Sequence, residues 1–193
     1  MPWFLGKDKF DERWAWVQVF TEQECIEIIK LGKKSNLNKA LINDGEEDEK
    51  RRITDICWFR FEREYFSEFE WIYRRCTDVV KNINEKFFNY DLTFIEELQF
   101  TAYNKKGSFY GKHIDSTYEG YTHRKLSFTI QLSDEKMYKG GDLLLYNSKD
   151  PDNAPKGIGV MTIFPSWTLH EVTPIKQGER YSLVGWVCGP KFK

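Results

Sequence analysis

The chain has 193 residues, enough for one domain with a substantial hydrophobic core. Its 29 basic and 30 acidic side chains nearly cancel, so no basic field argues for nucleic acid as a partner. With 40% apolar and 17% aromatic residues, the composition is typical of a globular protein and excludes a disordered chain. Because no apolar run is long enough for a secretion signal or a membrane span, we expect a soluble cytoplasmic protein that makes no membrane contact.

A strand followed by a helix is the first structure that the sequence predicts. Residues 14–20 (WAWVQVF) are dense in aromatic and β-branched side chains, which favours a strand. Thr21 and Glu24 have the spacing of a capping box, which predicts a helix from there to about Lys34. The side chains expected on its buried face are Cys25, Ile28 and Ile29.

A polar segment then separates this helix from a second strand and a second helix. It contains the run DGEEDEKRR, and we interpret residues 45–52 as solvent-facing, with a lid over the substrate as the alternative. Residues 53–61 return to strand character, and a second capping box, Ser67 with Glu70, opens the most periodic helix. Its expected buried stripe is Phe69, Ile72, Tyr73, Cys76, Val79, Val80, Ile83 and Phe87.

Short strand-like runs separated by turns fill the rest of the chain. They cover residues 95–104, 109–115, 125–132, 142–147, 158–164, 170–175 and 180–188. Regular short strands indicate a sandwich or jelly roll, so we predict a mainly β protein with flanking helices (α+β) in which the helices cover one sheet. We expect a single domain over residues 1–193, with supporting elements in 1–94 and the core in 95–190.

Four cysteines lie in this sequence without the Cys-x-x-Cys spacing of a metal or redox motif. They are Cys25, Cys57, Cys76 and Cys188. We expect reduced thiols in the core rather than disulfides or a zinc site.

His113 and Asp115 are the candidate metal ligands. Side chains two apart on a strand point to the same face, roughly 6–7 Å apart at the backbone, so an imidazole and a carboxylate can hold one ion from one side. His170 is the histidine in a comparable downstream strand, whereas His123 lies in a polar connection and is expected to be exposed. Two histidines and one carboxylate with open positions form the facial arrangement of non-haem Fe(II) oxygenases.

Arg180 follows His170 by ten residues, just past a glycine turn. If residues 176–178 close a hairpin, Arg180 lies opposite Pro174 and His170 lies opposite Val184. The backbones of His170 and Arg180 would then be about 13 Å apart on one face. That gap suits a short dicarboxylate with one end on the metal and the other on the guanidinium. A register shift of one residue would change this relation.

Beyond these residues, the sequence resembles an iron(II)/2-oxoglutarate-dependent dioxygenase of the prolyl 4-hydroxylase type. The matching segments run in order from Leu98 to Val187 and are LQFTAYNKKGSFYGKHID, RKLSFTIQLS, GGDLLLY and GIGVMTIFPSWTLHEVTPIKQGERYSLVGWV. The resemblance implies a double-stranded β-helix (jelly-roll) core. It also implies His113, Asp115 and His170 as iron ligands.

The resemblance further implies Arg180 as the partner of the distal 2-oxoglutarate carboxylate, where many members of the hydroxylase branch carry Lys. Tyr103 falls where the family often places a tyrosine that binds the same carboxylate. Ser182 and Trp186 point the same way along the last strand, and either could line the site or only pack. Tyr146 and Trp186 are candidate substrate-side rings near the mouth.

The function implied is hydroxylation of an aliphatic carbon with Fe(II), 2-oxoglutarate and O2, releasing succinate and CO2, with ascorbate as a further reductant. A peptidyl proline in a peptide or protein is the substrate that the resemblance favours. Lysyl, free amino acid or small-molecule substrates stay open, as do a jelly-roll binding module without turnover and a degenerate scaffold. The nucleic-acid demethylase branch has a second Arg six residues after the first, where this chain has Trp186. The sequence leaves the oligomeric state open.

Overall fold

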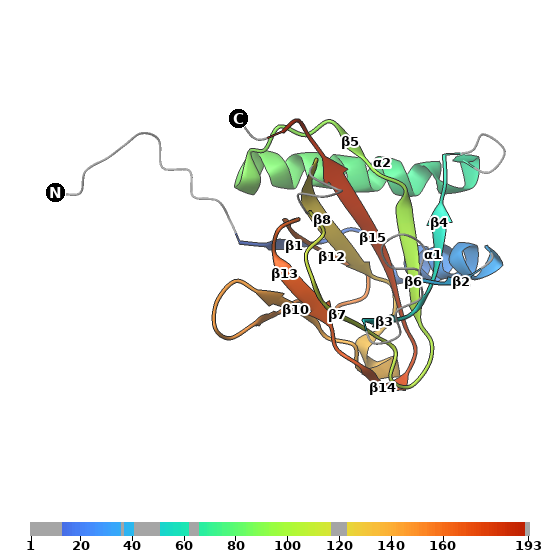
Figure 1. Ribbon diagram of the computed structural model, residues 1–193. Helices are drawn as coiled ribbons and strands as arrows, with labels where there is room; N and C mark the ends of the chain where they lie inside the picture. Colours follow the sequence, from blue (N-terminus) through green and yellow to red (C-terminus); the bar gives the residue numbers. More distant parts are fainter. Residues whose placement is uncertain (1–12, 36, 41–50, 62–65, 117–122, 192–193) are drawn as a thin grey trace.

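The computed structural model describes residues 13–35, 37–40, 51–61, 66–116 and 123–191 (Figure 1). Helix α1 covers Glu22–Lys34, and helix α2 covers Phe66–Ile83 and continues into a π-helical turn over Asn84–Phe88. The strands of the N-terminal half are β1 (Ala15–Gln18), β2 (Asn38–Lys39), β3 (Arg52–Ile53), β4 (Asp55–Phe59) and β5 (Phe94–Ile95). Those that follow are β6 (Leu98–Tyr103), β7 (Phe109–His113), β8 (Arg124–Gln131), β9 (Tyr138–Gly140), β10 (Leu143–Tyr146), β11 (Asp152–Asn153), β12 (Val160–Pro165), β13 (Leu169–Val172), β14 (Ile175–Gly178) and β15 (Arg180–Cys188).

Two antiparallel sheets form the body of the protein. The larger has the order β1-β12-β8-β15-β6-β4-β2, with β5 paired to β15. The smaller has the order β11-β10-β13-β7-β3, and a third, two-stranded sheet joins β14 to β9. Strands far apart in the sequence are therefore neighbours, as in a double-stranded β-helix, and the prediction of a mainly β jelly roll with flanking helices is confirmed.

Both faces of the larger sheet are covered, because alternate side chains of its central strands point to opposite sides. The face toward the helices is apolar and carries Leu98, Phe100, Ala102, Leu126, Phe128, Ile130, Tyr181, Leu183 and Val187. The opposite face borders a cavity between the two sheets and carries Gln99, Thr101, Tyr103, Ser127, Thr129, Val184 and Trp186. The first set forms the core, and the second supplies polar groups to the interior of the jelly roll.

Helix α1 begins with the predicted capping box, since Thr21 accepts the Glu24 amide while the Glu24 carboxylate accepts the Thr21 amide at 2.8 Å. Cys25 and Ile28 are buried, and Ile29 is partly buried against the same core. Gly32 lets the helix approach the sheet closely, because a Cβ at this position would lie 2.5 Å from the Phe100 ring.

Helix α2 packs beside α1 and departs from prediction at both ends. It begins at Phe66, so Ser67 lies inside the helix instead of capping it. As far as Ile83 its stripe is buried as expected, with Val79 partly buried, but the π-helical turn then adds a residue to the helical period. Phe88 is therefore buried in the position expected for Phe87, which is 38% exposed.

The hairpin predicted at residues 176–178 is wrong. Those residues belong to β14, which pairs with β9, and Gly178 turns the chain with φ +75° toward the larger sheet. His170 accordingly lies in the smaller sheet opposite Leu145, and Arg180 lies in the larger sheet opposite Tyr103. The two residues belong to different sheets, so the spacing argued along one hairpin does not apply.

All four cysteines are buried, and each carries a free thiol. Within the described ranges, no helix combines the length and apolar character that crossing a bilayer requires.

Candidate metal centre

Three predicted ligands converge between the sheets. His113, at the end of β7, is paired directly with His170 on β13, and Asp115 follows two residues after His113. His113 Nε2 lies 3.5 Å from Asp115 Oδ1, and His170 Nε2 lies 3.6 Å from Asp115 Oδ2. All three are buried, and their ligand atoms lie within 4.8 Å of one another. This is a compact set of two nitrogens and a carboxylate.

Backbone carbonyls fix both imidazoles in one tautomer. Nδ1 of His113 lies 2.8 Å from the Gly111 carbonyl oxygen, and Nδ1 of His170 lies 2.8 Å from the Thr168 carbonyl oxygen. A carbonyl oxygen only accepts hydrogen bonds, so each Nδ1 carries the proton and donates it. Each Nε2 is left with its lone pair directed toward Asp115, which is the arrangement of histidines that bind a metal.

A β-bulge in β7 brings Tyr110 to the same site. His113 pairs with His170 and Tyr110 pairs with Val172, so two residues of β7, Gly111 and Lys112, lie opposite the single residue Glu171 of β13. Tyr110 and His113 therefore both face the cavity, although they are an odd number of residues apart. Their rings stack with centroids 3.6 Å apart, which holds the His113 ring in place.

Asp115 lies beyond the end of β7 and is held by its neighbours. Its backbone N–H donates to the Ser166 carbonyl at 2.9 Å, and the Ser166 hydroxyl meets that of Ser127 on β8 at 3.0 Å. The Arg124 guanidinium lies 3.5 Å from the Asp115 carbonyl oxygen. These contacts tie the backbone of Asp115, at the end of a strand of the smaller sheet, to the larger sheet.

The electrostatics of the cluster favour a cation. Burial, and secondarily the neighbouring His170, lowers the pKa of His113 to about 3. Burial alone would raise the pKa of Asp115, but His170 and His113 outweigh that effect and keep the pKa below its ordinary value. Near neutral pH the cluster therefore presents a neutral His113 imidazole beside an ionised Asp115 carboxylate, the protonation state that a metal ion needs in these ligands.

Arg180 is a fully buried cation in the same interior. It faces Tyr103 across β15 and β6, with its guanidinium carbon 4.9 Å from the centre of the Tyr103 ring, and Tyr103 lines the cavity. Nη1 donates to Ser182 at 3.5 Å, while Nε and Nη2 have no hydrogen-bond partner in the described part of the chain. A buried guanidinium with unused donors is costly unless an anion satisfies it.

Trp186 lines the cavity on the same face of β15. Its buried indole N–H faces Asp115 and helps to lower the pKa of that carboxyl, but it completes no hydrogen bond within the described part of the chain.

Tyr146 does not reach the cavity, and its assignment to the substrate side is corrected. It alternates with Leu145, which points inward opposite His170, so Tyr146 lies on the outer face of the smaller sheet. There its hydroxyl donates to Glu171 and its ring contacts Lys112.

A family comparison supports this geometry. Residues 98–188 match the model of the 2OG-Fe(II) oxygenase superfamily, a range that contains all three clustered ligands and Arg180. Residues 98–188 belong to the 2OG-Fe(II) oxygenase superfamily.

Curated relatives of this oxygenase region are bacterial hydroxylases. A PKHD-type hydroxylase of Prochlorococcus marinus (strain MIT 9215) is 33% identical over 119 residues, which is 60% of this chain and 54% of the relative. Another, from Synechococcus sp. (strain CC9605), is 42% identical over 82 residues, which is 42% of this chain and 37% of the relative. The matched part of the chain thus spans about half, or less, of the length of these relatives.

Solved structures share the 2OG-Fe(II) oxygenase fold over nearly the whole chain. A prolyl hydroxylase from Trichoplax adhaerens, in complex with a hypoxia inducible factor peptide fragment, has a TM-score of 0.76 at 17% identity, covering 92% of this chain and 84% of its own. A Pseudomonas putida prolyl-4-hydroxylase has a TM-score of 0.71 at 20% identity, covering 92% and 93%. At such identities the likeness establishes the fold.

The side chains of the cluster and Arg180 fit the groups that the superfamily binds, Fe(II) and 2-oxoglutarate. The histidines and carboxylate match the two-nitrogen, one-oxygen set that non-haem ferrous iron takes. Arg180, with two unsatisfied donors, fits one carboxylate of 2-oxoglutarate.

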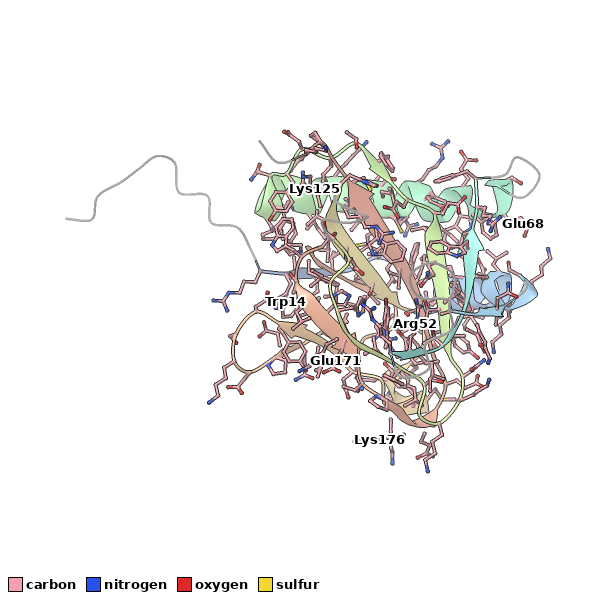
Figure 2. All side chains as sticks on the ribbon, viewed as in Figure 1. Trp14, Arg52, Glu68, Lys125, Glu171 and Lys176 are labelled. Carbon is pink, nitrogen blue, oxygen red and sulfur yellow. The ribbon has the colours of Figure 1, made fainter. Side chains whose placement is uncertain are left out.

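Arg52 is a residue of the site that the sequence did not predict, because it ends a charged run that was expected to face solvent. Residues 45–50 lie outside the described residues, but Arg52 is only 9% exposed and lies between the sheets (Figure 2). It donates to Thr54 at 2.7 Å and to Gln99 at 2.9 Å, and stacks on the Tyr110 ring at 4.4 Å. The alternation of Arg52 and Thr54 at the start of a strand was the signal available in the sequence.

Proposed function

We propose that the chain is an Fe(II)- and 2-oxoglutarate-dependent dioxygenase that hydroxylates an aliphatic carbon of a peptidyl proline and releases succinate and CO2. The observation that carries the proposal is the convergence of three ready ligands in the cavity beside a buried, unsatisfied arginine. Membership of residues 98–188 in the oxygenase superfamily supports the reaction class. The PKHD-type relatives and the prolyl hydroxylase neighbour bound to a peptide favour a peptide or protein substrate.

In this proposal the cluster of His113, Asp115 and His170 holds the iron. When bound, the iron supplies the chemistry that couples O2 to the oxidation of 2-oxoglutarate and of the substrate carbon. The carbonyls of Gly111 and Thr168 keep both imidazoles oriented throughout. The surrounding sheets exclude bulk water from the cluster.

Arg180 binds the distal carboxylate of 2-oxoglutarate through the donors that the protein leaves unused. Tyr103 and Ser182 orient the guanidinium, one through its ring and the other through its hydroxyl. Together these residues fix the cosubstrate at one end, so that its other end meets the ligand cluster.

Trp186 is the residue we assign to the substrate side. Its ring borders both the cavity and the surface residue Trp58, whose ring centre lies 5.9 Å away. The indole N–H, which completes no hydrogen bond among the described residues, is a donor for a carbonyl of an incoming peptide.

We extend the proposal to the organisation of the protein. Residues 1–193 act as one domain, supported by the pairing of β1 with β12 and of β4 with β6 across the two halves. A cytoplasmic location accords with four unpaired buried thiols. Ascorbate serves as an auxiliary reductant, which is tested by comparing total turnovers with and without it.

The test is succinate release from 2-oxoglutarate with Fe(II), with and without a panel of proline-containing peptides scored by mass for the gain of one oxygen. We expect peptide-stimulated turnover in the wild type and none in His113→Ala. Oxygen gain on lysyl peptides or free amino acids alone would replace the substrate assignment but keep the reaction. No turnover in either protein would favour a jelly-roll binding module.

A further inference from the structure

A second group of metal-ligating side chains lies outside the catalytic cluster. Glu96, His123 and Cys188 place a carboxylate oxygen, an imidazole nitrogen and a sulfur within 4.8 Å of one another. They come from the region where β5, β8 and β15 meet, since Cys188 pairs with Phe94 of β5 and with Arg124 of β8. Neither the oxygenase reaction nor the cosubstrate uses these three groups.

The distances within this group suit a tetrahedral ion. Cys188 Sγ lies 3.2 Å from Glu96 Oε1, and His123 Nε2 lies 3.8 Å from the same oxygen. With zinc bond lengths of about 2.0–2.3 Å, tetrahedral ligands are separated by about 3.4–3.6 Å. Both observed separations are within about 0.4 Å of that range. Small side-chain rotations therefore suffice to bring the three atoms around one ion.

Backbone contacts hold the group together before any ion arrives. The Gly189 N–H donates to the His123 carbonyl at 2.9 Å, which ties the residue after Cys188 to His123. The Thr93 N–H donates to the Cys188 carbonyl at 2.7 Å. The ligands thus belong to a paired framework rather than to independent surface side chains.

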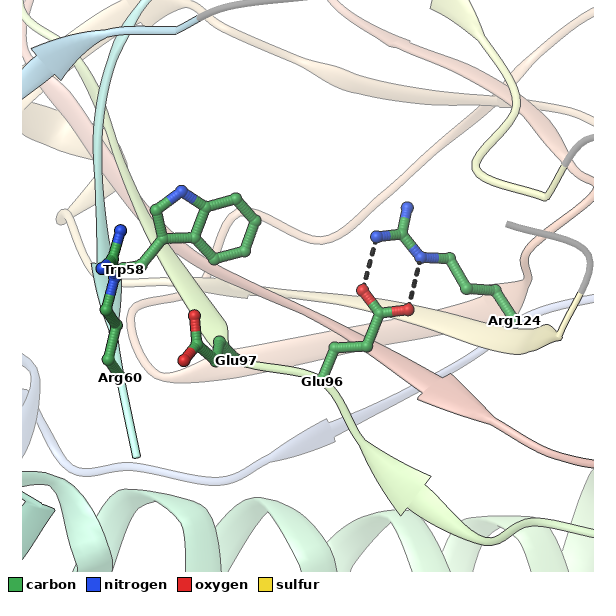
Figure 3. A pocket seen from close by; sticks show the side chains of 5 residues that line it. All are labelled: Trp58, Arg60, Glu96, Glu97 and Arg124. Atoms are coloured by element: carbon green, nitrogen blue, oxygen red, sulfur yellow. Dashed lines mark hydrogen bonds and ion pairs between the residues drawn. The ribbon is translucent and has the colours of Figure 1, made fainter. Parts of the chain in front are cut away.

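Arg124 acts as an outer partner of the group. Its Nε lies 2.8 Å from Glu96 Oε1, and its Nη2 lies 2.5 Å from Oε2, so the carboxylate is held at both oxygens (Figure 3). Ligating carboxylates commonly have such partners, which orient them toward the metal. A hollow of about 300 Å³, bordered by Trp58, Glu97 and Glu96, opens beside the pair.

The charges and the kinds of ligand favour a thiophilic divalent ion. The buried Cys188 thiol donates to Glu96, so it is protonated in the metal-free protein. When an ion binds, the S–H bond breaks, the proton leaves to solvent, and a sulfur–metal bond forms. One thiolate and one carboxylate, the latter also paired with Arg124, then face the divalent ion, and His123, whose side chain is 47% exposed, supplies the third protein ligand.

We propose that Glu96, His123 and Cys188 form a second metal site, distinct from the catalytic centre, that binds Zn²⁺ with three protein ligands and one solvent position. Sulfur, nitrogen and oxygen together are the ligands that zinc takes in proteins, and three protein ligands leave a fourth position open. Arg124 links the two sites, since its guanidinium contacts Glu96 as well as the Asp115 carbonyl oxygen and the Trp186 ring.

Anaerobic titration of the full chain with Co²⁺, a coloured stand-in for Zn²⁺, tests the proposal. Only a site with a sulfur ligand gives thiolate-to-cobalt charge-transfer absorption, so the catalytic cluster is silent in this measurement. We expect the band in the wild type and in His113→Ala, its loss in Cys188→Ser, and its displacement by Zn²⁺. The matched control is Cys57→Ser, another buried thiol, which should keep the band.

His123→Ala gives a second, independent readout, because an exposed side chain can be removed without disturbing the fold. Its affinity for Zn²⁺ at this site should fall by at least about tenfold, the lower end of what losing even an outer-shell partner costs. Absence of the thiolate band in the wild type would overturn the proposal, as would unchanged zinc affinity in His123→Ala. Neither outcome would affect the oxygenase assignment, since the catalytic cluster shares no residue with this group.

Discussion

His113 and His170 are direct partners across β7 and β13, and each ring donates its Nδ1 proton to the carbonyl oxygen two residues before it. The centroids of the two rings lie 4.1 Å apart, and both Nε2 atoms point toward Asp115. The tautomer of each histidine is therefore set by the strand that carries it.

Arg180→Gln should raise the KM for 2-oxoglutarate about 10- to 100-fold, because a hydrogen bond to a charged group contributes about 1.5–3 kcal/mol. Arg180→Lys keeps the charge and should recover part of that loss. The measurement is succinate release at varied 2-oxoglutarate and varied iron, with Lys176→Gln, an exposed cation on β14, as the control. Equal increases in the requirement for iron and for 2-oxoglutarate would show that Arg180 is not the anchor.

Arg52→Lys should lower the free energy of unfolding by about 1–3 kcal/mol, since an ammonium cannot satisfy both Thr54 and Gln99 in place of the guanidinium fork. Urea denaturation measures the change. The matched control is Arg51→Lys, because the neighbouring side chain is exposed and, among the described residues, Arg51 accepts a hydrogen bond from the Gly111 amide through its backbone carbonyl. Similar effects of the two substitutions would mean that the hydrogen bonds of Arg52 between the two sheets do not stabilise the fold.

Gly32→Ala should lower the free energy of unfolding by about 1–3 kcal/mol, the usual cost of overpacking. The added Cβ would meet the buried Phe100 ring at 2.5 Å and force α1 away from the sheet. Glu27→Ala, on the exposed side of the same helix, should leave stability nearly unchanged. If urea denaturation finds the Gly32→Ala protein as stable as the wild type, the helix can shift at no cost.

Stability should fall in alkaline solution because of the buried thiols. Burial raises the pKa of Cys25 to about 12 and that of Cys57 to about 11, from an ordinary value of 9.0. A raised folded pKa gives stability that is present below pH 9 and is lost as pH rises toward the folded value. Each such thiol contributes a slope of about 1.4 kcal/mol per pH unit in that window.

Urea denaturation at several pH values checks this behaviour. The free energy of unfolding of the wild type should decline above about pH 9, and Cys25→Ala should decline less steeply. An equal decline in both proteins would assign the loss to other groups.

The sequence predicted that His113, Asp115 and His170 would come together, because the signal lies in short-range spacing and strand character. His113 and Asp115 are two residues apart, and the order of strands after them is typical of a jelly roll. The capping box of Thr21 and Glu24 was likewise predicted, since both partners lie within one helical turn.

What the sequence could not provide is the pairing between distant strands. His170 and Arg180 were expected on one hairpin, but β13 and β15 belong to different sheets, because β14 pairs with β9. Tyr146 was misplaced for a related reason, since the face that a side chain occupies depends on register with β13. Arg52 was missed because its partner Gln99 lies 47 residues away and a charged run around it favours solvent.

Binding of 2-oxoglutarate by anaerobic calorimetry, with and without Fe(II), tests the central claim most directly. The wild type should bind 2-oxoglutarate tightly only when Fe(II) is present, and His113→Ala, Asp115→Ala and His170→Ala should each lose that dependence. Retention of iron-dependent binding in any of the three variants, or its absence in the wild type, would contradict the account.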